Sequence, residues 1–332
     1  MEPKIAKWGI LILLLVLVLI SSVIISTAVG PVSIPFKEVF TTLTNFNTGE
    51  MESTNEVIVL QIRLPRIILA VLVGSALAVA GATMQGLFKN PMADPYVIGI
   101  SSGAAFGVSI AIILHGSVPV VAFLCAVGTV FLVYKIAEGS GGIPVENLLL
   151  SGIAVAAFFS ALTSLVMYLA GENLHQIIFW LMGGLWASDW NKVTVAFPFI
   201  SLGIIGIFMF SRDLNAMLLG EEPAQHLGIE VENVKKILLV FVSLITAVAV
   251  SVSGIIGFVG LIIPHMVRIV VGPDHRILIP LCALVGGIFL VWTDALARTV
   301  IAPTELPLGI ITALLGVPFF IYLLHRKRGV FG

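Results

Sequence analysis

The chain has 332 residues, of which 59% are hydrophobic and 11% are charged, and its formal net charge is −1. A soluble domain carries roughly 25% charged residues, so this composition excludes a soluble globular fold. The near-neutral charge predicts neither a nucleic-acid partner nor an acidic substrate.

Long uncharged apolar runs predict an all-α integral membrane protein with about ten transmembrane helices. A helix needs about 20 apolar residues to cross the hydrocarbon core of a bilayer. Turn residues and charges place the spans at 8–29, 67–87, 95–114, 118–135, 147–170, 193–211, 236–253, 255–270, 277–297 and 306–325. Low-complexity segments and soluble linkers are absent from the sequence, so residues 1–332 are expected to form one transmembrane domain.

The first run, from Trp8 to Phe36, contains no charge. It is much longer than the 7–15 apolar residues of a cleaved signal peptide, which favours a retained first helix. Cys125 and Cys282 lie in apolar runs and are interpreted as small packing side chains, in preference to a disulfide.

Two later runs are too long for one span. The charge-free run from Pro95 to Tyr134 is expected to turn at 115–119, and the run from Ile237 to Val267 is expected to break at Ser253-Gly254. Between the fifth and sixth spans, residues 173–190 contain three tryptophans and predict a short interfacial helix with an aromatic belt.

Small residues recur every fourth position in three of the spans. The series are Gly74, Ala78, Ala82 and Gly86; Gly99, Gly103, Gly107 and Ala111; and Gly152, Ala156, Ser160 and Ser164. Such spacing gives a helix face that allows backbones to approach closely. We expect the second, third and fifth spans to pack inside the bundle.

The basic residues predict the orientation. With both termini in the cytoplasm, twelve of the 17 lysines and arginines lie on the cytoplasmic side and five lie outside. This positive-inside bias predicts a multi-pass protein of the plasma membrane.

The middles of the predicted spans contain no Asp, Glu, Lys or Arg. Gradient-driven transporters place ionisable or coordinating groups near the membrane midplane. His175 and His265 are interpreted as packing residues, and the sequence has no HExxH, nucleophile elbow or metal-ligand spacing. We therefore expect a transport subunit that is not an enzyme, and energy supplied by another subunit.

The longest cytoplasmic loop, residues 212–235, can hold two short amphipathic helices. Leu214, Met217 and Leu218 share one face before Gly220. Glu221, Glu222 and Pro223 favour a second helix start. Such helices could insert into a partner's groove, whereas the alternative is a solvated loop.

Arg63-Leu64-Pro65-Arg66 opens the second predicted span on the outer side. Two cations at a helix N-terminus oppose its dipole at about 0.3–1 kcal/mol each. An acidic group should compensate. It could belong to this chain, from among Glu50, Glu52 and Glu56, or to a partner, and both alternatives stay open.

The stretch RLPRIILAVLVGSALAVAGATMQGLFKNPMADPYVIGISSGAAFG (63–107) closely resembles the FecCD/BtuC family of ATP-binding-cassette (ABC) importer permeases. So do LGEEPAQHLGI (219–229), SGIIGFVGLIIPHMVRIVVGPDHRILIP (253–280) and ELPLGIITALLGVPFFIYLL (305–324). The matches follow the family's order and cover most of the chain after residue 60.

The resemblance implies a BtuC-like fold and a homodimer around a central pathway. Two cytoplasmic ATPase subunits and an extracytoplasmic substrate-binding protein complete such an importer. The residues that match the family's ATPase-coupling segment are Leu218, Leu219, Gly220, Glu221, Glu222, Ala224, Leu227 and Gly228. Those that match its binding-protein docking arginines are Arg63, Arg66 and Arg298.

The resemblance also implies a cytoplasmic gate at Asn90 and just before the fifth span. There Val145 and Glu146 depart from the small hydroxyl residues that the family can carry. The implied cargo is an iron(III)-siderophore, haem or cobalamin. No cofactor or metal site is expected in this subunit, since ATP and magnesium belong to the partner ATPase. The alternatives are an autonomous ion-gradient-driven secondary transporter and an intramembrane enzyme.

Overall fold

The computed structural model describes residues 2–44, 53–139 and 144–328, and within these ranges its regular elements are all helices. Ten of them correspond to the expected spans. They are α1 (Glu2–Ala28), α4 (Leu64–Leu87), α5 (Ile100–Ile113), α6 (Val118–Ala137), α7 (Val145–Leu169), α9 (Trp190–Met209), α12 (Val231–Ser253), α13 (Val259–Val271), α14 (His275–Thr299) and α15 (Leu308–Arg328).

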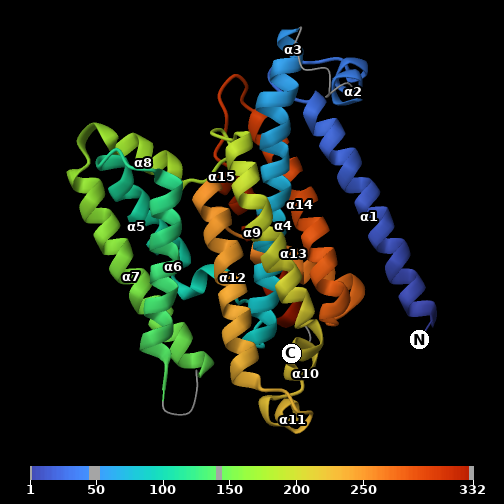
Figure 1. Ribbon diagram of the computed structural model, residues 1–332, viewed down its shortest axis with the longest axis vertical. Coiled ribbons are helices and arrows are strands. Elements are labelled where there is room, and N and C mark those ends of the chain that lie inside the picture. Colours follow the sequence, from blue (N-terminus) through green and yellow to red (C-terminus); the bar gives the residue numbers. More distant parts are fainter. Residues whose placement is uncertain (1, 45–52, 140–143, 329–332) are drawn as a thin grey trace.

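Shorter elements connect these helices at both ends of the bundle. They are α2 (Phe36–Thr44), α3 (Thr54–Val57), the π-helix η1 (Ile58–Arg63), the 3₁₀ helices η2 (Pro95–Ile98) and η3 (Gly171–Asn173), α8 (Leu174–Leu181), α10 (Ser211–Met217) and α11 (Glu221–His226). In Figure 1, α2 and α3 mark the upper end and α10 and α11 the lower end. We call these the α2–α3 end and the α10–α11 end.

Seven helices in the described ranges are each long and apolar enough to cross a membrane. The apolar parts of α5, α13 and α15 are shorter. The all-helical membrane fold is therefore confirmed, with ten as an approximate count of spans.

Helix α4 forms the centre of the bundle and is buried along nearly its whole length (Figure 1). It packs on α9, α12, α13 and α14. A Cβ atom on Gly74 would lie 2.2 Å from the Gly286 carbonyl oxygen of α14, and one on Gly81 would lie 1.8 Å from that of Gly260 in α13. The helices approach so closely that only glycine fits at these positions.

Helices α5, α6 and α7 form a second group beside this core (Figure 1). Gly103 and Gly107 of α5 face α6, and a Cβ on Gly103 would lie 1.9 Å from Thr129 Oγ1. Helix α7 was expected inside the bundle, but it is exposed along most of its length and buries only a few residues near its start and Thr163. On one side, its small residues therefore have no partner helix among the described residues of this chain.

The helix that holds the RLPR motif begins earlier than expected. It runs without interruption from Thr54 through η1 into α4, and Ser53 and Glu56 form a capping box at its start. Pro65 falls in the first turn of α4, directly after the π-helical turn. A π-turn loosens the regular hydrogen-bond ladder, which lets the helix continue across a residue without an N–H.

The long run 237–267 breaks after Ser253. Gly254 has φ +68°, and α13 starts at Val259 instead of near 255. A Cβ on Gly254 would lie 2.4 Å from the Trp180 carbonyl oxygen of α8. The unwound link therefore packs against the end of α8, which requires a glycine there.

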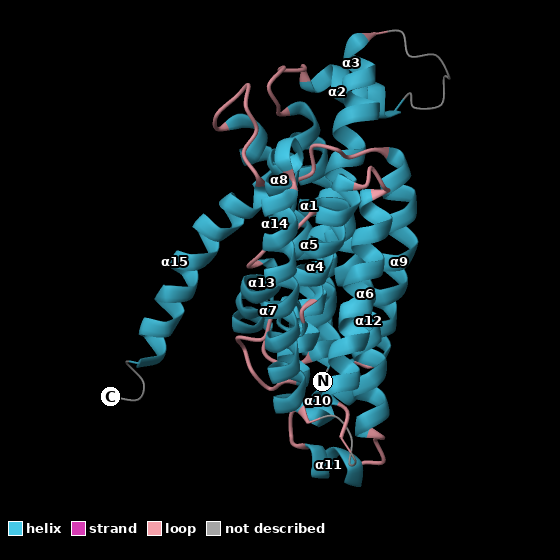
Figure 2. Cartoon of the chain, turned by 90° about the vertical axis from the view of Figure 1, so that its left-hand side faces the viewer, coloured by secondary structure: helices cyan, strands magenta, loops and turns pink. Residues whose placement is uncertain are grey.

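Helix α15 leans away from the rest of the bundle (Figure 2). It contacts only α13 and α14 extensively, and its exposed face carries Leu314, Leu315 and Val317. Such a face is suited to lipid or to another protein helix.

Candidate functional site

The α10–α11 end carries two short helices that project beyond the long ones (Figure 1). Leu214 and Met217 of α10 are buried, and α10 packs against α4 and α14. This burial fixes α10 on the membrane-spanning bundle, so that the loop has a defined position.

A hydrogen-bonded bridge from Asn215 strengthens this attachment. Its Nδ2 donates to Asp274 Oδ1 at 2.7 Å, and its Oδ1 accepts from the backbone N–H of His275 at 2.8 Å. Asp274 caps the start of α14 and also pairs with Arg276 at 2.6 Å. These bonds join α10 directly to the first turn of α14.

This arrangement stabilises the ionised form of the Asp274 carboxyl over its protonated form. Hydrogen bonds from Arg276, and then from Asn215, lower the pKa of the Asp274 carboxyl well below its usual range. The buried His275 ring extends the bridge inward, because its Nε2 lies 2.7 Å from where a Cβ of Gly86 would be. A displacement of α10 would thus also displace the start of α14 and the end of α4, because these contacts connect the three helices.

Helix α11 is held by charge. Glu221 pairs with Lys235 of α12 at 2.8 Å, and Ala224 is buried. Gly220 and Gly228 adopt φ values of +135° and +84° on either side of the helix. Leu219 and Leu227 are 73% and 66% exposed, and Leu218 and Glu222 are also exposed. An anchored loop that presents exposed leucines fits a protein partner better than solvent.

The predicted gate residues lie at the same end. Asn90 Oδ1 accepts from the backbone N–H of Met92 at 2.9 Å and so forms the turn after α4. Val145 lines a small cavity together with Leu87 and Phe88, while Glu146 is exposed on the first turn of α7. The ends of α4 and α7 meet here, and the gating role itself remains a prediction.

At the α2–α3 end, Arg66 is buried between two carboxylates. Its Nε lies 2.9 Å from Asp294 Oδ1, and its Nη1 lies 3.0 and 2.9 Å from the two oxygens of Glu305. Asp294 is fully buried in α14, and Glu305 follows α14 in the chain. The pairing joins α4 to both segments.

Arg298 and Arg63 are also buried. Arg298 Nε is 2.9 Å from Asp294 Oδ2, and the two groups form an ion pair without hydrogen-bond geometry. The Nη2 of Arg298 donates to Ser26 Oγ at 2.8 Å. Arg63 donates to the carbonyl oxygens of Thr27 and Ala28 at the end of α1 and of Val32 in the segment that follows. The three arginines therefore fasten α1, α4 and α14 together.

The predicted docking arginines thus expose only 5% (Arg63), 7% (Arg66) and 3% (Arg298) of their surface. Of the two alternatives, the chain contains the internal salt bridge, but with carboxylates other than those expected. Glu56 takes part in the helix cap, and Glu50 and Glu52 lie outside the described residues. Contact with a binding protein stays a prediction.

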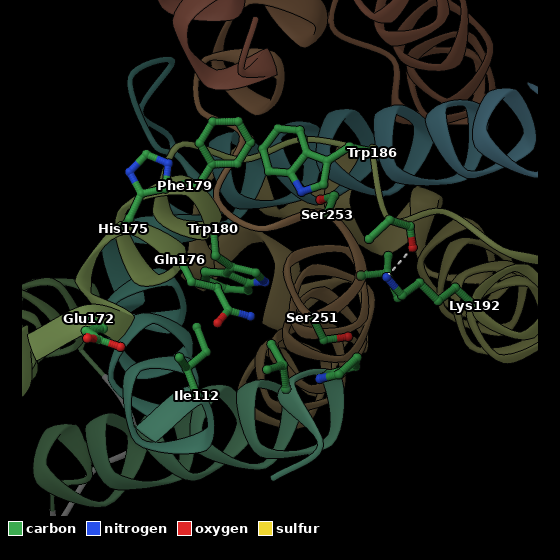
Figure 3. A pocket seen from close by; sticks show the side chains of 15 residues that line it. Ile112, Glu172, His175, Gln176, Phe179, Trp180, Trp186, Lys192, Ser251 and Ser253 are labelled. Atoms are coloured by element: carbon green, nitrogen blue, oxygen red, sulfur yellow. Dashed lines mark hydrogen bonds between the residues drawn. The ribbon is translucent and has the colours of Figure 1, made fainter. Parts of the chain in front are cut away.

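A cavity of about 540 Å³ opens near α8 at the same end (Figure 3). Phe179 lies between His175 and Trp186, with ring centroids 5.9 and 4.5 Å away. Trp190, expected in the same aromatic belt, instead donates from Nε1 to the Leu60 carbonyl oxygen at 2.9 Å. The tryptophans of 173–190 therefore do not form one belt: Trp186 packs on Phe179, whereas Trp190 binds the backbone of Leu60.

A second cavity, of about 700 Å³, lies between α8, the unwound link before α13, and α15. Its lining is apolar and includes Met182, Phe258 and Leu314. Among the described residues, no group of three or more His, Cys, Asp or Glu could hold a metal ion. The lining of this cavity therefore offers few polar groups that could bind a ligand tightly.

The comparison with known proteins decides the family. Residues 14–326 match the FecCD transport family. The chain belongs to the FecCD transport family. This confirms the resemblance drawn from its motifs, and the chain is accordingly a multi-pass permease, a transport subunit.

Its relatives carry several cargoes. The chain is 49% identical to the cobalamin import system permease protein BtuC of Halobacterium salinarum, over 83% of this chain and 75% of that protein. It is 39% identical to the hemin transport system permease protein HmuU of Yersinia pestis, over 98% and 97% of the two chains. A metal-chelate type ABC transporter solved in an inward-facing conformation is 34% identical, with a TM-score of 0.85 over 96% of this chain and 99% of that one.

Proposed function

We propose that this chain is the permease subunit of an ATP-driven importer for a metal chelate or corrinoid, such as an iron(III)-siderophore, haem or cobalamin. The observation that carries the proposal is the anchored α10–α11 loop with its exposed Leu219 and Leu227. Such a loop can pass a partner's movement to α14 and α4. The relatives named for cobalamin and hemin support the cargo class.

Two copies of the chain would form the complete pathway. Helices α7 and α15 carry exposed apolar faces, and the apolar cavity beside α15 would then open toward the second copy. Two cytoplasmic ATPase subunits would hold the α10–α11 loops and supply ATP and magnesium, while this subunit holds no cofactor. Hydrolysis would shift the dimer between inward- and outward-open states.

The α10–α11 end would accordingly face the cytoplasm, with the chain in the plasma membrane and both termini inside. The substrate-binding protein would dock at the α2–α3 end. Arg63, Arg66 and Arg298, which resemble the family's docking arginines, lie at this end, although their burial supports a role in holding the helices together. Reversing their charge would therefore disturb the fold as well as any docking.

The test is uptake in vesicles that contain the permease, its ATPase and its binding protein. Leu219→Asp combined with Leu227→Asp should reduce ATP-driven uptake at least about tenfold, because two apolar contacts with the ATPase are lost. His226→Asp, an exposed polar position of α11, is the matched control. Full uptake by the double variant would contradict the proposal.

The runner-up function, a secondary transporter driven by an ion gradient, predicts a different response. Its uptake would stop with an ionophore and continue without ATP. The described spans carry their charged residues near the helix ends, which favours the ATP-driven importer.

A further inference from the structure

The outer surfaces of α6 and α12 enclose an apolar groove of about 420 Å³ that no step of the proposed transport cycle uses. Both helices line it. The residues from α6 are Phe123, Val127, Val130, Phe131 and Tyr134, and those from α12 are Lys236, Leu239, Val240, Ser243 and Leu244. We call it the α6–α12 groove. Most of its walls are aliphatic or aromatic, so its occupant should be apolar along most of its length.

The groove lies on a surface that faces the membrane. Leu124 and Phe131 of α6 and Val240 of α12 are highly exposed, and both helices are candidate membrane spans. The faces proposed above for a second copy, on α7 and α15, belong to other helices. The groove is therefore expected to contact lipid.

The length of the groove corresponds to one leaflet. From Phe123 to Tyr134 the lining covers eleven helical steps, or roughly 17 Å at 1.5 Å per residue. Half of the hydrocarbon core measures about 15 Å. The groove thus runs from one interface to the middle of the membrane, which is the reach of a single acyl chain.

The interfacial end of the groove is polar and basic. Tyr134 and Lys236 line it, and Lys135 follows on the last turn of α6. Lys135 is paired with Glu138 at 3.0 Å, and this pairing, with a smaller effect of Lys236, lowers the pKa of the Glu138 carboxyl. Two ammonium groups against one carboxylate leave a net positive charge where a lipid phosphate would lie.

We propose that the α6–α12 groove binds one acyl chain of an anionic phospholipid, with Lys236 at its phosphate. The lipid comes from the leaflet on the α10–α11 side, which is the cytoplasmic leaflet if the orientation proposed above holds. Lys236 directly follows Lys235, the partner of Glu221 in α11. The bound head group therefore lies next to the segment that holds the coupling loop.

Lipid binding can be measured without transport, so its failure is distinguishable from failure of the proposed function. The full chain, purified in its native assembly and delipidated, is titrated with phosphatidylglycerol and with phosphatidylethanolamine, and bound lipid is counted by native mass spectrometry. Lys236→Gln should weaken phosphatidylglycerol binding about fivefold and leave phosphatidylethanolamine binding unchanged. Lys89→Gln, which removes an exposed cation at the same end, should change neither.

A second pair of variants tests the apolar part. Val240→Trp fills the groove and should weaken binding of both lipids about tenfold or more, whereas Leu202→Trp on the exposed face of α9 should not. Ser243 is buried with no hydrogen-bond partner for its Oγ, and Ser243→Ala should leave binding intact because an acyl chain does not need the hydroxyl.

Three outcomes would overturn the proposal. Wild-type phosphatidylglycerol binding in Val240→Trp would show that the groove is not the site. Weaker binding in Ser243→Ala would indicate a polar ligand. A change of oligomeric mass in Val240→Trp would indicate that a second protein copy covers the groove.

Discussion

The buried charges at the α2–α3 end are organised by one residue, Asp294. It lies within 2.9 Å of both Arg66 and Arg298, and it is completely buried. The sequence identified Arg63 and Arg66 as charges that need compensation, because two cations at a helix N-terminus oppose its dipole, whereas Arg298 was named only through the family resemblance. It could not identify the partners, since Asp294 lies 228 positions away from Arg66 and local spacing carries no information about such pairs.

Asp294→Asn tests this organisation. The substitution keeps the shape of the side chain but, among the residues that the structure describes, leaves the two buried guanidinium groups with Glu305 as their one nearby carboxylate. We expect a loss of about 3–5 kcal/mol in stability, seen as a lower thermal unfolding midpoint of the detergent-solubilised protein.

The matched control is Asp189→Asn. Asp189 caps α9 at the same end but is exposed, so its replacement should cost about 1 kcal/mol or less. Equal midpoints for Asp294→Asn and the wild type would contradict a structural role of the cluster.

Among the elements, α4 and α10 illustrate what local patterns reveal. Small-residue spacing correctly indicated close helix contacts of α4, because the pattern depends on a single helix face. The earlier start of that helix at Thr54 was not evident, since charges and Pro65 normally end a membrane helix and only the π-turn before Pro65 lets it continue. The two short helices of the 212–235 loop followed from their leucines and glycines, whereas the Asn215 bridge had no signal in the sequence.

Asn215→Ala tests whether the bridge transmits movement. Without its hydrogen bonds to Asp274 and His275, α10 is tied to α14 by packing alone, and we expect more ATP hydrolysed per cargo molecule in reconstituted vesicles. Asn233→Ala is the control, because the Asn233 side chain donates to Glu230 within its own segment.

The bridge also predicts a pH effect. The folded-state pKa of Asp274 is lowered, so its stabilisation is present above the unfolded pKa of about 4 and is lost as the pH falls through the folded pKa. Asn215→Ala should raise this pKa and shift the acid loss of stability to higher pH. An unchanged coupling ratio and acid profile would argue against the bridge.

For the whole molecule, family membership and the all-helical membrane fold were predictable, because composition and several ordered motifs point the same way. The exposed state of α7 was not predictable from one chain. Its small residues predict contact with a helix, but the sequence does not say whether that helix belongs to the same copy. The structure leaves Tyr168 86% exposed, with Phe158 and Leu165 on the same helix, so the partner is expected in a second copy.

Ala157→Trp tests this arrangement. Ala157 is exposed on α7, where a tryptophan is compatible with lipid but not with a closely packed helix. We expect the mass measured by light scattering in detergent to fall from dimer to monomer. Val195→Trp, on the exposed face of α9, should leave the mass unchanged, and a dimer in both variants would place the interface elsewhere.

The Arg66–Asp294–Glu305 pairing has a consequence for biogenesis. During synthesis α4 is inserted into the bilayer before α14 has been made. Until then the Arg66 side chain has no Asp294 to pair with, so it must stay near the interface, where water solvates its charge. It can become buried only after α14 has been inserted. Completion of the core therefore depends on the last third of the polypeptide, which supplies both carboxylates that neutralise Arg66.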